Sequence, residues 1–298
     1  MSFLWIPITL IAAAAQTARN ATQRSLTESI GMVGATQVRF LYGLPFALIF
    51  LLAVCLISGT APPALSLAVF LFALAAALFQ ILATVLMLTA MQTKSFSVTT
   101  AYIKTEPILT AIVGFLLLGD SLTLLKVVGI LVASAGVVLM TVRVESVKAL
   151  LVEARPALIG IAAGACFGMS AVAFRGAILE LPSGGFVLRA TTILALGLAI
   201  QTILLLAYLL LFDRVSLIKS LGVWKASLLA GFLGAFASQF WFLGFALTSA
   251  ANVRTLALVE VFFAQILSRK IFAETLSPRE YCGMLLMIIG VGLVLINA

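Results

Sequence analysis

The sequence predicts an all-α polytopic membrane protein, with ten transmembrane helices arranged as two inverted five-helix repeats. First, 63% of the 298 residues are hydrophobic and only 9% are charged, whereas soluble domains carry roughly 25% charged residues. Second, apolar runs of about 20 residues, the length that crosses the hydrocarbon of a bilayer, recur along the chain. Third, the second half repeats a pattern of the first half, which indicates a duplication.

The apolar runs predict ten spans, joined by short connections that contain turn-forming residues. In chain order the spans are Phe3–Ser25, Val33–Ser58, Leu65–Met91, Val98–Leu118, Leu122–Val142, Pro156–Leu179, Gly185–Phe212, Leu221–Thr248, Val253–Phe272 and Pro278–Asn297. No Lys or Arg precedes the first run, so we expect a retained helix rather than a cleaved signal peptide. The longest polar connection, Arg143 to Arg155, separates the predicted repeats, which we assign to residues 1–147 and 148–298.

Spans four and five are repeated as spans nine and ten. A shift of 154 positions aligns Ala101–Leu139 with Thr255–Leu293. It places Glu106 on Glu260, Asp120 on Glu274, Ser121 on Thr275, Leu122 on Leu276, Gly129 on Gly283 and Gly136 on Gly290. Because five is an odd number of spans, the second half must enter the membrane from the opposite side, which makes the repeat inverted. Asp120 and Glu274 precede spans five and ten, and we assign them a helix-capping role.

Span six carries Gly160, Gly164 and Gly168 at intervals of four. Small residues at this spacing lie on one helix face and let a neighbouring backbone approach closely. We therefore expect a packing role for this face, with a hinge or a solute-facing groove as the alternative.

Span four holds the charged residues Lys104 and Glu106, and span nine holds Arg254 and Glu260. A charged side chain at mid-membrane costs about 3 kcal/mol on insertion scales, so such residues need a partner or a function. One interpretation is that they pair across the two helices and only hold the halves together. The other is a polar solute site at the repeat interface, where a glutamate could also take up and release a proton.

Further candidate site residues are polar or aromatic side chains in the predicted spans. They are Gln16 and Asn20 in span one, Gln80 in span three, Tyr102 in span four, Phe167 and Ser170 in span six, Gln239 and Trp241 in span eight, and Gln265 in span nine. For each of them, an interhelical hydrogen bond or core packing is the alternative to solute contact. Tyr102 and Glu106 are four residues apart and can share a helix face, whereas Lys104 and Glu106 cannot. The two cations favour a solute that carries a carboxylate or phosphate.

Enzymes and nucleic-acid-binding proteins are poor matches to this composition. The chain has no histidine, which removes a Ser-His-Asp triad and any histidine-ligated metal. No phosphate-binding Gly-rich loop is present, and the basic residues are scattered rather than clustered. We therefore expect no enzymatic activity, no cofactor, no metal and no nucleic-acid partner. Most loop cations fall on one side of the membrane, and the positive-inside rule then favours both termini outside.

The chain resembles the EamA-type branch of the drug/metabolite transporter superfamily. The resemblance rests on an acidic residue followed by Leu and Thr or Ser, then two glycines, near the end of each half. The residues are Asp120, Leu122, Thr123, Gly129 and Gly136-Val137 in the first half, and Glu274, Leu276, Ser277, Gly283 and Gly290-Val291 in the second. Glu106-Pro107 is similar to the start of the family's fourth span, whereas Val261 stands where span nine commonly has proline. The resemblance implies a central cavity lined by spans one, three, four, six, eight and nine.

Taken together, these features predict a secondary-active transporter, an exporter or exchanger, that moves a small metabolite by alternating access. The expected solute is amino-acid-like or otherwise anionic, and protons or a counter-solute would drive its movement. We expect a multi-pass protein of the bacterial inner (cytoplasmic) membrane, surrounded by lipid, that is a monomer or homodimer. The alternatives are a flippase for lipid or lipid-linked substrates and a membrane scaffold subunit that transports nothing.

Overall fold

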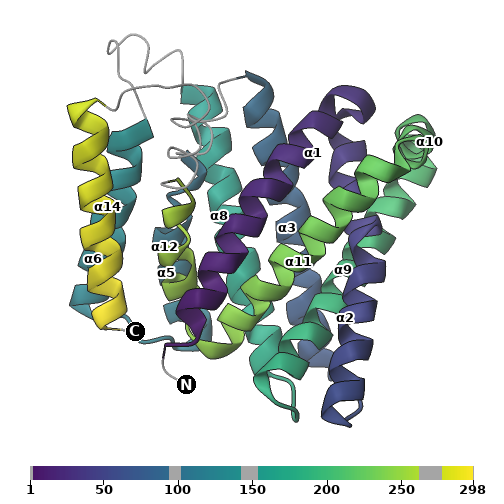
Figure 1. Ribbon diagram of the computed structural model, residues 1–298, viewed down its shortest axis with the longest axis horizontal. Coiled ribbons are helices and arrows are strands. Elements are labelled where there is room, and N and C mark those ends of the chain that lie inside the picture. Colours follow the sequence, from purple (N-terminus) through teal and green to yellow (C-terminus); the bar gives the residue numbers. More distant parts are fainter. Residues whose placement is uncertain (1–2, 94–101, 142–153, 262–276, 298) are drawn as a thin grey trace. The chain divides into compact units, whose positions relative to one another are not determined.

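The computed structural model describes residues 3–93, 102–141, 154–261 and 277–297, and all regular structure in these ranges is helical (Figure 1). Six helical stretches within them are long and apolar enough to cross a membrane: Val33–Ser58, Leu67–Ala90, Leu158–Leu179, Phe186–Phe212, Trp224–Leu247 and Pro278–Ile296. Glu106–Leu118 and Leu124–Met140 are shorter apolar helices. The all-helical, multi-span class is therefore confirmed, with six of the ten predicted spans present as long helices.

The helices form two compact units, one made of Met1–Ile81 with Ala173–Leu247 and the other of Leu82–Val172 with Thr248–Ala298. Each unit thus draws on both halves of the sequence, and helices α3 and α8 each contribute residues to both units. The described helices are α1 (Trp5–Leu41), α2 (Gly43–Ser58), α3 (Leu67–Thr93), α5 (Glu106–Leu118), α6 (Leu124–Thr141), α8 (Ala154–Leu179), α9 (Phe186–Phe212), α10 (Arg214–Gly222), α11 (Trp224–Leu247), α12 (Ala250–Leu256) and α14 (Pro278–Ile296).

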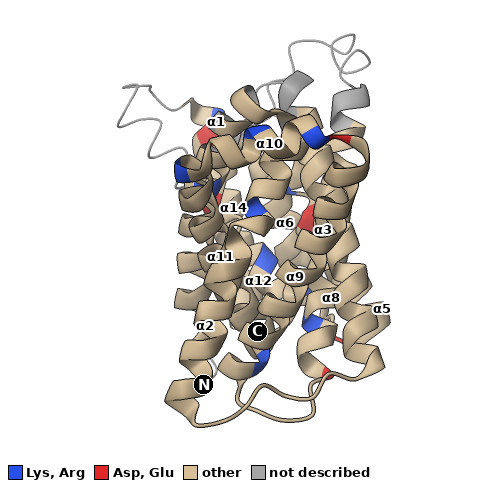
Figure 2. Ribbon diagram, turned by 90° about the vertical axis from the view of Figure 1, so that its right-hand side faces the viewer, with Lys and Arg blue, Asp and Glu red and all other residues tan. Residues whose placement is uncertain are grey.

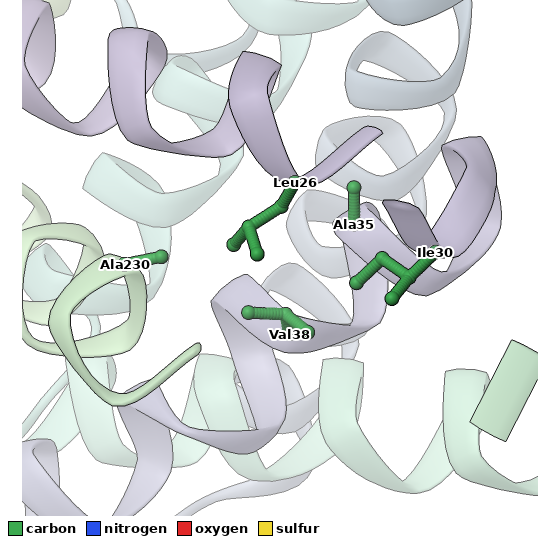
Figure 3. Packing of buried hydrophobic residues seen from close by; sticks show 5 residues of the cluster. All are labelled: Leu26, Ile30, Ala35, Val38 and Ala230. Carbon is green, nitrogen blue, oxygen red and sulfur yellow. The ribbon is translucent and has the colours of Figure 1, made fainter. Parts of the chain in front are cut away.

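In the first unit, the connection predicted between spans one and two is itself helical. Only Gly31, with φ 74° and ψ 175°, leaves the helical conformation within α1, and glycine adopts such a positive φ without steric cost. Gln23 Nε2 donates to the carbonyl oxygen of Ala35, 3.1 Å away, and so joins the two arms of α1. Ala230 of α11 packs with buried side chains from both parts of α1, before and after Gly31 (Figure 3): Leu26, Ile30, Ala35 and Val38.

The predicted eighth span is also divided differently. Residues expected in the connection before Leu221 form the separate helix α10, and the long helix α11 begins only at Trp224. The side chain of Asp213 accepts a hydrogen bond from the Ser216 backbone N–H at 3.1 Å. Such a bond satisfies one of the backbone donors that a helix start leaves without an intrahelical partner, so Asp213 is the N-cap of α10.

In the second unit, α6 and α14 are antiparallel and in close contact. A Cβ added to Gly129 would lie 2.8 Å from the Gly290 carbonyl oxygen, and one added to Gly136 would lie 2.6 Å from that of Gly283. The earlier glycine of one helix thus meets the later glycine of the other. Gly129 and Gly283 are matched positions of the duplication, as are Gly136 and Gly290, so each glycine of one half meets the partner of the other glycine of that half.

Helix caps also occupy matched positions in the two halves, but they are not the acidic residues we expected. Thr123 Oγ1 accepts from the Lys126 backbone N–H at 3.3 Å at the start of α6. Ser277, which is 154 positions later, caps α14 through the Glu280 N–H at 3.3 Å. Within the Asp120–Thr123 stretch the cap is therefore Thr123 and not Asp120, because α6 begins at Leu124, four residues after Asp120. Glu274 lies outside the described residues.

Candidate functional site

Predicted span four is interrupted just before its glutamate. Tyr102 and Ile103 are helical, Lys104 and Thr105 form a turn, and α5 begins at Glu106. Pro107 has no backbone N–H and cannot donate to the carbonyl four residues earlier, which explains why a continuous helix is not formed here.

Predicted span nine is interrupted in the same place. Helix α12 ends at Leu256, Ala257 and Leu258 form a turn, and the chain is helical again from Val259. The break again precedes the matched glutamate, Glu260. Val261 occupies the position of Pro107, so the second break forms without a proline.

The charged residues of these two segments form two ion pairs within the second unit. Lys104 Nζ lies 2.7 Å from Glu260 Oε2, and Arg254 Nε lies 2.9 Å from Glu106 Oε1. We call these four side chains the charged cluster. Each residue is only 6% to 8% exposed, although charged residues are sparse along the helices as a whole (Figure 2).

The two pairs differ in geometry. Lys104 donates an aligned hydrogen bond to Glu260, whereas Arg254 Nε and Glu106 Oε1 are close without hydrogen-bond alignment. The first pair therefore combines charge attraction with a directional bond, while the Nε–Oε1 contact of the second pair depends on charge.

In each pair, a cation from one predicted repeat contacts the acid of the other repeat. Two cations and two carboxylates give the charged cluster no net formal charge, so the excess of positive charge that would favour an anion is absent when all four are ionised. Helical periodicity placed Lys104 and Glu106 on opposite faces, yet both contact the Arg254–Glu260 segment. That expectation assumed an unbroken helix, and the turn at Lys104 and Thr105 invalidates it.

Helix α8 packs against the interrupted segment through its small residues. A Cβ on Gly164 would lie 2.6 Å from the Ile103 carbonyl oxygen, and one on Gly168 would lie 2.7 Å from Thr110 Oγ1. The packing role predicted for these two glycines is confirmed. Phe167 and Ser170 are buried on the same helix, and Tyr102 is half-buried.

Five further candidates lie in the first unit, where most of them bond to a neighbouring helix: Gln16, Asn20, Gln80, Gln239 and Trp241. Trp241 Nε1 donates to Gln16 Oε1 at 2.9 Å, and Gln239 Nε2 donates to Thr191 Oγ1 at 2.9 Å. The amide of Gln80 accepts from Gln201 Nε2 at 2.6 Å. These bonds join α1 to α11, α9 to α11 and α3 to α9, as the alternative interpretation of interhelical hydrogen bonds predicted.

The remaining contacts complete the placement of the predicted residues. Asn20 Oδ1 accepts a hydrogen bond from Nη2 of its neighbour Arg19 at 2.7 Å, and Gln265 lies outside the described residues. Gln201 and Thr191, the hydrogen-bond partners of Gln80 and Gln239, were not among the residues expected from the sequence. An isolated amide in the long apolar run of span seven was the available signal for Gln201.

Among the described residues, no group of three or more Cys, Asp or Glu side chains could hold a metal ion.

Comparison with known proteins adds family information to this geometry. The sequence profile of the EamA-like transporter family matches residues 3–142 and again residues 154–296. A solved structure titled "Crystal structure of protein" superposes with a TM-score of 0.72 at 15% sequence identity, covering 100% of this chain and 98% of that chain. At that identity the likeness concerns the fold alone. None of the curated protein sequences compared with the chain matches it.

Proposed function

Because the chain belongs to the EamA-like transporter family of the drug/metabolite transporter superfamily, we propose that it is a secondary-active carrier whose charged cluster binds the transported solute. Family membership makes the protein a multi-pass membrane transporter. The proposal adds the mechanism, which is alternating access between two inverted repeats of five spans, and the direction, which is export or exchange across a bacterial inner membrane.

The observation that carries the proposal is the cross-pairing of the charged cluster on two interrupted helices. Inverted-repeat transporters commonly bind solutes where discontinuous helices of the two repeats meet. Ionisable side chains inside a membrane are costly, and they commonly line solute pathways. Lys104–Glu260 and Arg254–Glu106 combine both features, since each pair joins a segment of one repeat to a segment of the other.

Charge balance in the cluster limits the form in which a solute enters it. A carboxylate that contacts Lys104 or Arg254 must displace a glutamate, and the displaced glutamate then needs a new positive partner or a proton. An amino-acid-like zwitterion supplies that partner through its ammonium group. A simple anion must instead enter together with a proton. We therefore propose a solute that is amino-acid-like, or otherwise anionic and accompanied by a proton.

A thermal-shift screen of the purified protein against amino acids, nucleotide sugars and organic anions tests the proposal. We expect one class to raise the Tm, and we expect Glu106→Gln and Lys104→Ala to remove that shift. Arg279→Gln, which changes an exposed cation on α14, is the control and should keep it. A stabilising solute whose effect survives both cluster variants would remove these residues from the site.

Charge reversal separates solute binding from a purely structural role. The double variant Lys104→Glu with Glu260→Lys keeps an ion pair of opposite polarity at the same position. If the pair binds solute, the double variant should regain the stability lost in each single variant but still fail to respond to solute. Recovery of both the stability and the solute response would support the scaffold interpretation of this pair instead.

A further inference from the structure

The short helix α10 has one packed face and one exposed face. Leu217 and Ser220 are buried, and the Ser220 carbonyl oxygen accepts from Ser227 Oγ of α11 at 3.4 Å. The other face exposes large apolar side chains, with Ile218 68% exposed and Trp224, directly after the helix, 53% exposed. Such a face needs an apolar environment, although α10 is too short to cross a bilayer.

The length of α9 places α10 at the membrane surface. Its 27 residues span about 40 Å at ~1.5 Å per residue, which exceeds the ~30 Å of hydrocarbon. The two ends of α9 therefore lie at opposite interfaces. Tyr208 in its last turns and Trp224 at the start of α11 are both exposed, and these two residue types are enriched at the headgroup level.

Cations surround the exposed apolar face of α10. Arg214, Lys219 and Lys225 are all exposed, and Lys225 Nζ lies 5.6 Å from the centre of the Trp224 ring. Asp213 is the single acid of this segment. At the other end of α9, residues 180–185 contain no Lys or Arg, and the nearest cations, Arg175 and Arg189, are half-buried within α8 and α9. Exposed positive charge is thus concentrated at one end of this span, which is the cytoplasmic end in most membrane proteins.

We propose that Asp213–Lys225 is an interfacial segment that binds anionic phospholipid headgroups in the cytoplasmic leaflet. Val215, Ile218 and Leu221 insert among the acyl chains, and the three cations contact lipid phosphates above them. Long basic side chains reach headgroups in this way while their aliphatic parts stay apolar. The end of α9 at Phe212 is then the cytoplasmic end, whatever the total number of spans.

Native mass spectrometry of the purified chain with phosphatidylglycerol or phosphatidylcholine tests the lipid contact. We expect preferential binding of phosphatidylglycerol, weakened about fivefold by each of Arg214→Gln, Lys219→Gln and Lys225→Gln. Arg279→Gln, at a cation outside the segment, should leave binding unchanged. Equal binding of the two lipids, or displacement of phosphatidylglycerol by inorganic phosphate with no effect of Ile218→Ser, would overturn the proposal.

Sidedness is tested with two glycines at opposite ends of α9. Gly185 and Gly222 both have open space where a side chain would begin, so cysteine should be tolerated at either position once Cys55, Cys166 and Cys282 are replaced. In intact cells a membrane-impermeant maleimide should label Gly185→Cys, whereas Gly222→Cys should react only after permeabilisation. The reverse pattern would place α10 at the outer face and overturn the cytoplasmic assignment.

Discussion

Gly136 of α6 and Gly283 of α14 leave no room for a side chain between their backbones. A Cβ on either residue would lie 2.6 Å from the carbonyl oxygen of the other, which is closer than real Cβ atoms approach any neighbour. The same seven-residue glycine spacing occurs on both helices, and it brings matched segments of the duplication together in antiparallel order. Close approach of this kind supplies packing energy that the hydrophobic effect cannot supply between helices in lipid.

Replacing Gly136 with alanine should destabilise the protein by about 1–3 kcal/mol, the usual effect of overpacking a tight contact. The added methyl group would meet backbone atoms of α14, and backbone cannot move aside as a flexible side chain can. Thermal unfolding in detergent measures the effect. Gly292→Ala is the matched control, because a Cβ at that position of α14 meets nothing within 4 Å. An unchanged Tm for Gly136→Ala would contradict the close packing of α6 and α14.

The fold class followed directly from the sequence because lipid imposes a simple rule: a spanning segment must be apolar and must satisfy its own backbone hydrogen bonds. That rule does not describe connections. Gly31 is the only break in α1, and α10 is helical, because local hydrogen bonding and packing decide these positions. Residues 26–32 and 213–220 have weak apolar periodicity, and the sequence therefore predicted loops there.

Breaking one ion pair of the charged cluster should cost more than removing it entirely. Lys104→Met leaves Glu260 buried without its counter-charge, and Glu260→Met does the same to Lys104; each single change is expected to destabilise by about 3–5 kcal/mol. The double variant should be clearly more stable than either single variant. A double-mutant cycle on the unfolding free energies measures this coupling. Additive effects would mean that the two side chains do not depend on each other.

The candidate site was predictable by residue type but not by partner. The charged side chains of spans four and nine, two of them at matched repeat positions, identified Lys104, Glu106, Arg254 and Glu260, because burying a charge in a membrane is costly. The sequence could not show that each cation takes the acid of the other repeat. That pairing depends on the turns before Glu106 and Glu260, and only the first turn has a proline signal.

The hydrogen bond between Gln201 and Gln80 is a structural contact in the first unit, and its loss should have a modest effect. Gln201→Leu removes the donor and leaves a buried amide oxygen, at a cost of about 0.6–1.7 kcal/mol, the range typical of hydrogen bonds inside membranes. The Tm of Gln201→Leu relative to the parent chain measures this loss. An unchanged Tm would show that the hydrogen bond between Gln201 and Gln80 does not contribute to stability.

Acid should weaken the cap of α10 because the cap is a carboxylate. The hydrogen bonds that Asp213 accepts from Ser216 hold its pKa below the ordinary value of 3.8. A carboxyl group whose pKa is lower in the folded state contributes stability above its unfolded pKa, and that contribution is lost as the pH falls through the folded pKa. The asparagine side chain of the variant Asp213→Asn can accept the same bond without titrating. The Tm advantage of the parent chain over Asp213→Asn should therefore be present at pH 6 and shrink as the pH falls below about 4, because the folded-state pKa lies below the ordinary value of 3.8. A Tm difference that stays constant across this range would rule out the charged Asp213 cap.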